Sequence, residues 1–186
     1  MYVVLAAGDA SRMGFAKVFT PLAGTSPLTR VARAIGDRTA ICVVQGPRLN
    51  DAIEHAPELL VVVNDSPDRG MMHSLRLALE AIPPDRTIGV ILADMPLLEA
   101  SLLDALESAA TDSNADVVFP RRADGTPGYP MLFSLRARAA LTKLGDGDRL
   151  GEIRDDASLS QCAVAFEDPA AFCDLDLPED WNAFGA

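Results

Sequence analysis

Short apolar runs alternate with amphipathic segments along the first part of the chain. Five continuous, β-prone apolar runs predict strands at 2–7, 39–44, 59–63, 87–93 and 116–119. Between these runs, apolar residues recur every three or four positions, which predicts helices at 28–35, 49–55, 70–82 and 97–110. Because the strands are apolar throughout rather than alternating, we expect a sheet that is covered on both faces.

Strands that alternate with helices form βαβ units, and such units build a parallel sheet. We therefore predict an α/β fold with a three-layer, doubly wound, mostly parallel sheet. In open sheets of this kind, ligands bind beyond the carboxyl ends of the strands. Gly8 and Asp94 each follow a predicted strand directly, so both are candidate site residues.

The remaining part of the chain is less regular. The elements expected there are a polar loop at 121–128, a short strand at 131–133, a helix at 135–144, a turn at 145–149, strands at 162–166 and 172–175, and a helix at 178–184. Pro178 stands at the start of that last helix, where proline is favoured. No repeat or linker divides the sequence, so we expect a single domain over residues 1–186.

The charge of the chain limits the partners that it can have. The net charge is −11, which repels nucleic acid and anionic membranes. A small anionic substrate would need local cations or Mg²⁺. The three cysteines show no C-x-x-C spacing, which favours a reducing, cytoplasmic setting. No apolar run approaches ~20 residues, so we expect neither export nor a membrane span.

The segment 3–17 carries the clearest candidate chemistry. A buried strand ends at Gly8, and a loop with Gly14 and two cations, Arg12 and Lys17, follows. Glycine lets the backbone approach a ligand closely. Exposed N–H groups with Arg and Lys suit a polyphosphate. This pattern predicts a site for a polyphosphate.

Three other interpretations of this segment compete with a phosphate site. Strand-to-turn segments with glycine are common in α/β proteins, where nearby cations are usually only solvated. The Walker pattern needs Lys directly after its second glycine, but Phe15 follows Gly14. The dinucleotide pattern G-x-G-x-x-G is broken by Asp9 and Ala10.

The order L-A-A-G, then S-R-M-G and Lys17, resembles the signature loop of the molybdenum cofactor cytidylyltransferase-like (MobA/MocA-related) nucleotidyltransferase family. The match departs from the family at Ala10 and Ala16. In this family, which has a Rossmann-like nucleotide-diphospho-sugar transferase fold, the loop wraps the triphosphate. The resemblance implies nucleotide-binding roles for Leu5, Ala6, Ala7, Gly8, Ser11, Arg12, Gly14 and Lys17, with Arg12 and Lys17 also acting in catalysis.

The same resemblance implies a metal site. A-D-M-P at 93–96 is similar to the family's metal-binding motif, which makes Asp94 a Mg²⁺ ligand and a catalytic residue. D-L-D-L-P-E-D at 174–180 resembles the family's D-x-D-T-P-E-D segment, although Leu177 replaces Thr, and implies Asp176 as the second ligand. The alternative roles are an N-cap at Asp94 and an acidic helix start at Asp176.

Two further motifs concern the substrates. G-M-M-H-S-L at 70–75 is similar to a family turn near the nucleotide base, which implies that Gly70 and Ser74 bind the nucleotide. Alternatively, the apolar side chains of this turn are simply core and Ser74 is incidental. G-Y-P-M-L-F at 128–133 resembles the wall facing the second substrate and implies Gly128, Tyr129 and Pro130, with Tyr129 replacing the usual His.

Taken together, the resemblance implies a Mg²⁺-dependent nucleotidyltransferase. It would transfer a nucleoside monophosphate to molybdopterin or the molybdenum cofactor and release pyrophosphate. Ala7 favours CTP, because L-A-G-G in relatives goes with GTP. The alternatives are a guanylyltransferase, an enzyme acting on a sugar or isoprenoid phosphate, and a non-catalytic nucleotide-binding or chaperone domain that partners a molybdoenzyme.

Overall fold

The fold is described by a computed structural model that covers residues 1–8, 16–168 and 172. The predicted helix 178–184, and all but the first residue of the predicted strand 172–175, lie outside this description. The strands are β1 (Tyr2–Leu5), β2 (Ala40–Gln45), β3 (Leu60–Asn64), β4 (Ile88–Leu92), β5 (Val117–Arg121), β6 (Met131–Phe133) and β7 (Gln161–Ala165). The helices are α1 (Pro27–Ile35), α2 (Leu49–His55), α3 (Met71–Ala81), α4 (Ala100–Ser113), α5 (Leu135–Leu141) and α6 (Leu150–Arg154), with 3₁₀ turns η1 (Gly46–Arg48) and η2 (Pro67–Arg69).

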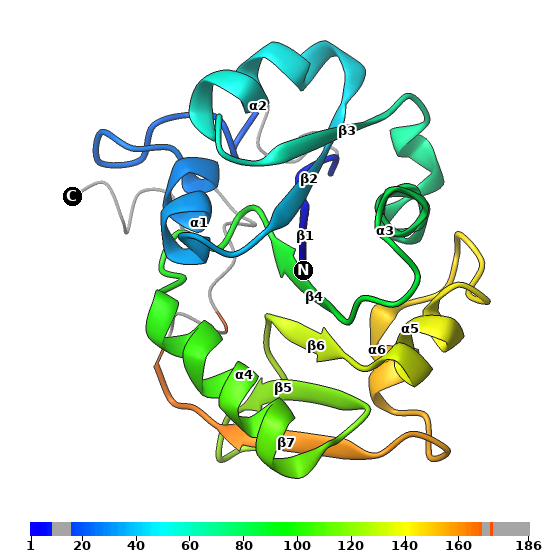
Figure 1. The fold of residues 1–186 in the computed structure, drawn as a ribbon. Helices are drawn as coiled ribbons and strands as arrows, with labels where there is room; N and C mark the ends of the chain where they lie inside the picture. The colour runs from blue at the N-terminus through cyan, green and yellow to red at the C-terminus, as the bar shows by residue number, and fades with distance from the viewer. Residues whose placement is uncertain (9–15, 169–171, 173–186) are drawn as a thin grey trace.

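The strands form one seven-stranded sheet in the order β3-β2-β1-β4-β6-β5-β7 (Figure 1). The chain moves outward from β1 to β3 and then crosses back through α3 to β4, on the other side of β1. Among the described strand pairs, only those made by β6 are antiparallel. The predicted doubly wound, mostly parallel sheet is confirmed, and its winding direction changes between β1 and β4.

Helices cover both faces of the sheet, as the apolar strands predicted. Tyr2 and Val4 face a buried cluster shared with α1, α2 and α4. Val3 points the opposite way, into a cluster shared with α3, α5 and α6. Figure 1 shows these two helical layers on either side of the strands. Because β1, β2, β4 and β5 bury side chains on both faces, their sequences do not alternate between apolar and polar residues.

A close approach fixes the start of β1 against β4. Tyr2 lies over Gly89, where a Cβ atom would come within 2.5 Å of Cε1 of the Tyr2 ring and 2.7 Å of Cδ2 of Leu132. The phenol donates to Oε1 of Glu107 on α4 at 2.7 Å. Burial and this acceptor raise the pKa of Tyr2. Glycine is therefore required in the middle of β4 because the aromatic ring occupies the space of a side chain.

Two helices end or begin several residues from their predicted bounds, and one helix was not predicted. The helix predicted at 97–110 begins at Ala100, because the chain first makes a turn in which the Leu98 N–H donates to the Met95 carbonyl at 3.2 Å. Leu98 is buried in that turn, so it extended the apolar pattern without being helical. The helix predicted at 135–144 ends at Leu141. Helix α6 was not predicted, since its five residues are too few to show a helical period.

Candidate active site

The candidate site lies where the carboxyl ends of β1 and β4 meet. Leu5 and Leu92 are partners in the parallel register, and the Ala93 N–H donates to the Leu5 carbonyl at 3.1 Å. The segments that follow these strands therefore leave the sheet side by side. Gly8 and Asp94, predicted as site residues, lie on these two segments. This is the point where the winding direction changes, and open α/β sheets bind ligands there.

A lysine–carboxylate pair joins the two segments. Nζ of Lys17 lies 2.6 Å from Oδ2 of Asp94, and each side chain is 17% exposed. Lys17 stands on a turn in which the Phe19 N–H donates to the Ala16 carbonyl at 3.0 Å. The Phe19 ring is buried in the core and anchors the turn. The pair is thus partly shielded from water but still reaches the surface.

The N-cap interpretation of Asp94 does not agree with the fold. Helix α4 begins six residues later, at Ala100, and Glu99 is the residue that precedes it. An N-cap side chain accepts from the N–H groups of the first helical turn, which Asp94 is too early in the chain to do. The carboxylate at Asp94 is instead directed to the lysine at the carboxyl edge of the sheet.

Gly8 has room around its α-carbon as far as the described residues extend. Gly8 is exposed, and no atom of the described residues lies within 4 Å of the position that a Cβ would occupy. The glycine is not needed for packing within the described residues. The neighbouring backbone is held by Gln45 at the end of β2, whose Nε2 donates to the carbonyls of Ala7 at 3.2 Å and Gly8 at 3.4 Å. A ligand could therefore approach a supported main chain.

The predicted base-side residues lie on the next connection, between β3 and α3. Gly70 has φ of +87°, a conformation that favours glycine, and directly precedes α3. Ser74 is buried, and its hydroxyl receives a hydrogen bond from Nδ2 of Asn64 at 2.9 Å. Asn64 also accepts from the Ser66 N–H at 2.8 Å. The hydroxyl of Ser74 is thus part of a network that shapes this turn.

The predicted acceptor wall reaches the same edge by a different route. Strand β6 is antiparallel to β4, with Met131 opposite Val90. Residues 128–130 therefore lie beside the carboxyl end of β4 rather than at its beginning. Gly128 and Pro130 are buried and Tyr129 is half-buried. The Gly128 N–H donates to the Pro120 carbonyl at 2.8 Å.

The structure thus brings together part of the predicted set. Leu5, Ala6, Ala7, Gly8, Lys17 and Asp94 gather at the ends of β1 and β4, with residues 70–74 and 128–130 on connections at the same edge of the sheet. Ser11, Arg12, Gly14 and Asp176 lie outside the described residues. Their proposed contacts stay predictions.

Sequence reasoning missed three polar residues near this edge. Gln45 and Asn64 are the last residues of two apolar strands, which is the signal that would have found them. Asp146 belongs to the turn 145–149, and its carboxylate pairs with Arg69 at 2.7 Å and Arg76 at 2.9 Å. These two arginines lower the pKa of Asp146. The turn is thereby attached to η2 and α3 beside Gly70.

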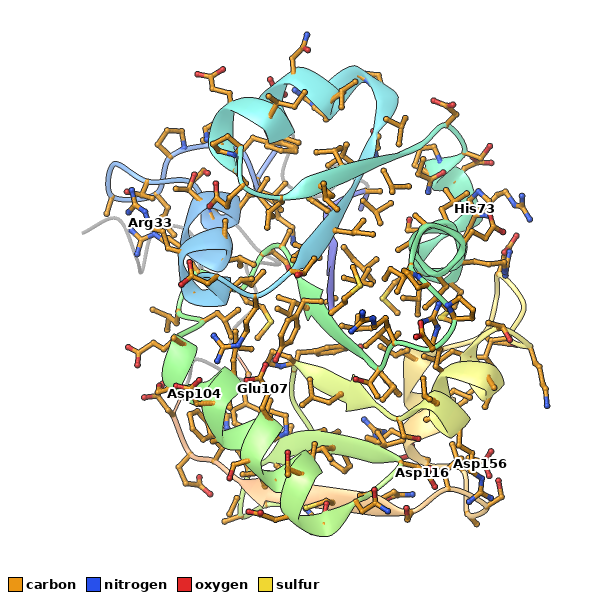
Figure 2. The ribbon with its side chains drawn as sticks, viewed as in Figure 1. Arg33, His73, Asp104, Glu107, Asp116 and Asp156 are labelled. Atoms are coloured by element: carbon orange, nitrogen blue, oxygen red, sulfur yellow. The ribbon has the colours of Figure 1, made fainter. Side chains whose placement is uncertain are left out.

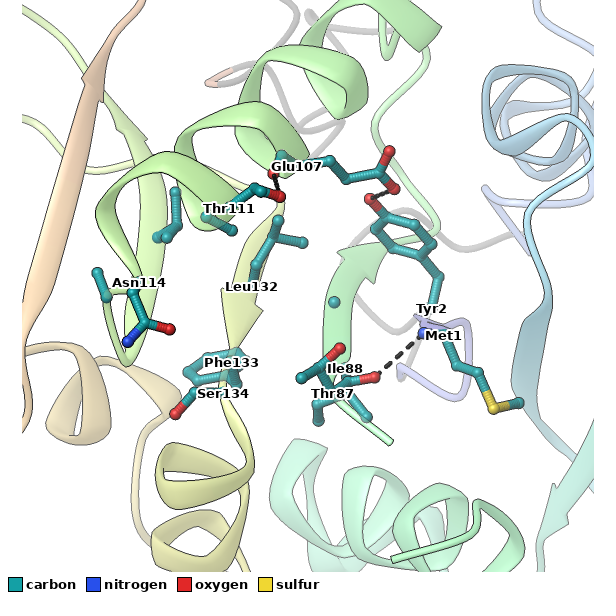
Figure 3. A pocket seen from close by; sticks show the side chains of 14 residues that line it. Met1, Tyr2, Thr87, Ile88, Glu107, Thr111, Asn114, Leu132, Phe133 and Ser134 are labelled. Atoms are coloured by element: carbon teal, nitrogen blue, oxygen red, sulfur yellow. Dashed lines mark hydrogen bonds between the residues drawn. The ribbon is translucent and has the colours of Figure 1, made fainter. Parts of the chain in front are cut away.

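The opposite, amino edge of the sheet carries a pocket of about 290 Å³ (Figure 3). It lies between α4 and the starts of β1 and β4, and its lining includes Tyr2, Glu107, Thr111 and Phe133. Some of its polar groups bond one another: Figure 3 shows the Tyr2 hydroxyl bonded to Glu107 and the Met1 amino group bonded to the Thr87 carbonyl. This pocket is remote from the Lys17–Asp94 pair.

The described residues at the carboxyl edge offer few ligands for a divalent metal. Among the described residues, no three His, Cys, Asp or Glu side chains gather as a metal site. Asp94 offers the hard oxygen atoms of one carboxylate, whose charge is already balanced by Lys17. Mg²⁺ is commonly bound by one or two carboxylates, with substrate phosphates and water completing its coordination. The donor chemistry therefore suits a metal that arrives with phosphate.

A doubly wound sheet with polar side chains at its switch point has the architecture in which Rossmann-like proteins bind ligands. The MobA-like NTP transferase domain matches residues 2–161. The chain belongs to this nucleotidyltransferase family, as its signature loop indicated. None of the helices in the described part of the chain has the length and apolar character needed to cross a bilayer.

Three relatives illustrate the similarity. The bifunctional protein GlmU of Burkholderia thailandensis is 35% identical over 133 residues, which are 68% of this chain but 29% of that protein. A molybdenum cofactor guanylyltransferase of Xanthomonas euvesicatoria is 29% identical and matches 97% of this chain and 91% of its own. Rv0371c of Mycobacterium tuberculosis has a crystal structure that superposes with a TM-score of 0.82 at 26% identity, covering 99% of this chain and 95% of that one.

Proposed function

We propose that this protein transfers CMP from CTP to a phosphate of molybdopterin or the molybdenum cofactor. An oxygen of the acceptor phosphate attacks the α-phosphorus, a new phosphoanhydride bond forms, and the α–β bridging bond breaks. The bonding electrons and the negative charge leave with pyrophosphate. The observation that carries this proposal is the Lys17–Asp94 pair beside the open backbone of Gly8.

The residues of the chain would act mainly by positioning and by neutralising charge, as phosphoryl transfer requires. Lys17 would bind the β- and γ-phosphates and offset the charge that develops on pyrophosphate. Arg12, by the resemblance of its loop, would share this role. Gly8 leaves room for phosphate oxygens to approach N–H groups of the loop, and Gln45 keeps that backbone in place.

Asp94, together with Asp176, would hold Mg²⁺ against the phosphates. The metal would supply charge neutralisation at the α-phosphate and orientation of the acceptor. A further structure of Rv0371c, 25% identical to this chain with a TM-score of 0.77 and covering 99% of it and 96% of its own chain, is described as a complex with manganese. That relative supports a divalent metal here without selecting Mg²⁺.

The substrate-facing assignments follow from position along the same edge. Gly70 and Ser74 would shape the wall beside the base. Gly128, Tyr129 and Pro130 would face the acceptor, since β6 delivers them to the carboxyl end of β4. Tyr129 in place of histidine would change the contacts to the acceptor rather than the chemistry at phosphorus.

A guanylyltransferase is the second candidate, because the Xanthomonas relative of that name matches almost the whole chain. Ala7 separates the two candidates in the signature loop. It is 4% exposed and packs in the α3-side core, so an Ala7→Gly change removes one methyl group near the nucleotide loop. If Ala7 selects CTP, that variant should shift the ratio of kcat/KM values toward GTP by a few-fold, the size expected for one methyl group.

The experiment measures pyrophosphate release with CTP, GTP, ATP or UTP, each with molybdopterin and Mg²⁺. We expect release with CTP above the other three. Release with GTP alone would support the second candidate, and release only with a sugar or isoprenoid phosphate would replace the acceptor. Nucleotide binding without release under all conditions would favour a non-catalytic domain that serves a molybdoenzyme.

A matched pair of variants tests the site itself. Asp94→Asn should abolish release, whereas Glu99→Gln should not. Glu99 precedes α4 and is exposed, so the two changes remove equivalent charges five residues apart. Equal losses in both variants would show that general charge, and not the position of Asp94, accounts for the effect.

A further inference from the structure

The Lys17–Asp94 pair has a consequence for the order in which ligands bind. We propose that the site accepts a divalent metal only together with the nucleotide, because Lys17 holds the carboxylate of Asp94 until phosphate oxygens draw its ammonium group away. This inference rests on the proposed function of the same site. It concerns the form of the substrate: the metal complex of the nucleoside triphosphate.

The geometry of the pair supports this inference. At 2.6 Å, the ammonium group of Lys17 is in hydrogen-bonding contact with Oδ2 of Asp94. A metal ion that bound this carboxylate alone would have to displace the ammonium or lie close to it, and both cations would repel each other. Because each side chain is only 17% exposed, water screens this repulsion less than at an open surface.

A triphosphate removes this conflict. Its β- and γ-phosphate oxygens are strong acceptors for a lysine ammonium group. The flexible side chain of Lys17 would then turn from Asp94 to the phosphate. The carboxylate is then available to a metal that the same phosphates also bind. By linkage, the metal strengthens nucleotide binding by the same factor as the nucleotide strengthens metal binding.

The test measures Mn²⁺ binding by electron paramagnetic resonance of the free ion, with no nucleotide present. The Lys17→Met variant should bind one Mn²⁺ at least tenfold more tightly than the wild type. Arg33→Met is the matched control, because it removes one positive charge from an exposed position on α1 (Figure 2). That control should bind Mn²⁺ like the wild type, and Lys17→Met/Asp94→Asn should lose the gained site.

A second measurement uses CTP affinity, obtained by calorimetry in EDTA and in saturating Mn²⁺. The ratio of the two dissociation constants should be larger in the wild type than in Lys17→Met. Circular dichroism checks that the variant is folded, and Lys17→Gln replaces it if it is not. The ratio of constants cancels the direct loss of the contact between lysine and phosphate.

The possible failures are distinct. One result is that the wild type without nucleotide binds Mn²⁺ as tightly as Lys17→Met, or that Arg33→Met gains as much Mn²⁺ affinity as Lys17→Met. Either result would show that Lys17 does not block metal binding, while the metal site at Asp94 would stand. If no variant binds Mn²⁺ and the metal does not change CTP affinity, the assignment of Asp94 under the proposed function is overturned.

Discussion

The two edges of the sheet use polar residues in opposite ways. At the amino edge, Glu107 accepts from the Tyr2 hydroxyl and from Arg38, whose Nε lies 2.9 Å away, and Arg38 also reaches Asp104 (Figure 2). At the carboxyl edge, a flexible lysine meets Asp94 beside the open space at Gly8. The first arrangement locks helices to strands, whereas the second leaves groups that a ligand can engage. The two groups of charges thus differ in what surrounds them rather than in residue type, since Asp146 at the carboxyl edge is also held in ion pairs that fix a turn.

The largest expected effect is the loss of catalysis in Asp94→Asn. Removing a group that stabilises transition-state charge costs about 10²–10³ in kcat, so we expect at least such a loss in the pyrophosphate-release assay. The free energy of unfolding should fall by only about 1 kcal/mol, since Lys17 can turn toward water. A variant that unfolds as it loses activity would place Asp94 with the structural charges of the amino edge instead.

The converse change is Arg138→Met at the amino edge. Arg138 is 6% exposed. Its guanidinium donates to four carbonyl oxygens at the end of α3 and in the residues that follow it, those of Leu79, Ile82, Pro83 and Arg86. Burial lowers the pKa of Arg138. Leaving these acceptors without a donor should reduce the free energy of unfolding by about 2–4 kcal/mol. Urea titration measures this loss.

The activity of the Arg138→Met protein, per folded molecule at low temperature, should equal that of the wild type. Arg33→Met serves as the control for the removed charge and should leave both properties unchanged. A drop in kcat without a change in stability would contradict the division between the two edges.

Asp116, at the start of β5, is a structural carboxylate whose contribution to stability should depend on pH. Its carboxylate accepts from the Ser160 N–H at 3.0 Å and from the Ser134 hydroxyl at 2.8 Å, and these bonds hold its pKa below the ordinary value of 3.8. The ionised form is favoured by folding, so this stabilisation is present above about pH 4 and is lost as the pH falls through the depressed pKa.

Asp116→Asn should therefore be less stable than the wild type by about 1–2 kcal/mol at pH 7. The difference should shrink steadily in urea titrations taken to pH 3 and below. Asp37→Asn, a change at an exposed position, should show no such difference. If the difference in free energy of unfolding between Asp116→Asn and the wild type did not change with pH, the carboxylate would not be its source.

The smallest expected effect belongs to Gly8→Ala. The new methyl group meets no atom of the described residues within 4 Å, so the free energy of unfolding should change by less than about 0.5 kcal/mol. It would, however, occupy space needed by phosphate, and nucleotide affinity should fall roughly fivefold, or about 1 kcal/mol. Gly147→Ala adds a methyl group to equally open space and should leave affinity unchanged. Matching affinities for both variants would argue that no ligand approaches Gly8.

The buried parallel strands follow from features that are local in the sequence. The apolar runs around Val4, Val43 and Val90 predicted buried parallel strands, and Gly8 and Asp94 could be placed at the same edge because each ends such a run. The antiparallel direction of β6 could not be predicted. Its three residues carry no directional signal, and only their pairing with β4 and β5 fixes their direction.

Polar contacts between distant parts of the chain could not be predicted from the sequence either. Nothing near Arg138 indicates that it closes the end of α3 more than 50 residues earlier. The sequence indicated Lys17 as a candidate phosphate-binding residue and Asp94 as a candidate metal ligand, but it did not indicate that the two form a pair. Their contact, from which the coupling of metal and nucleotide is inferred, depends on the fold bringing two distant segments together.

The reversed direction of β6 also affects how this protein could diversify. Because β5 leaves the sheet at the carboxyl edge and β6 enters there, the whole connection 122–130 projects on the side of the candidate site. Its tip is a polar turn in which the Arg122 N–H donates to the Thr126 carbonyl at 2.9 Å. Replacing this hairpin tip with one of another length would leave the strand ladder untouched. Under the proposed function, acceptor preference could therefore evolve through loop exchange, independently of the half that we propose binds phosphate.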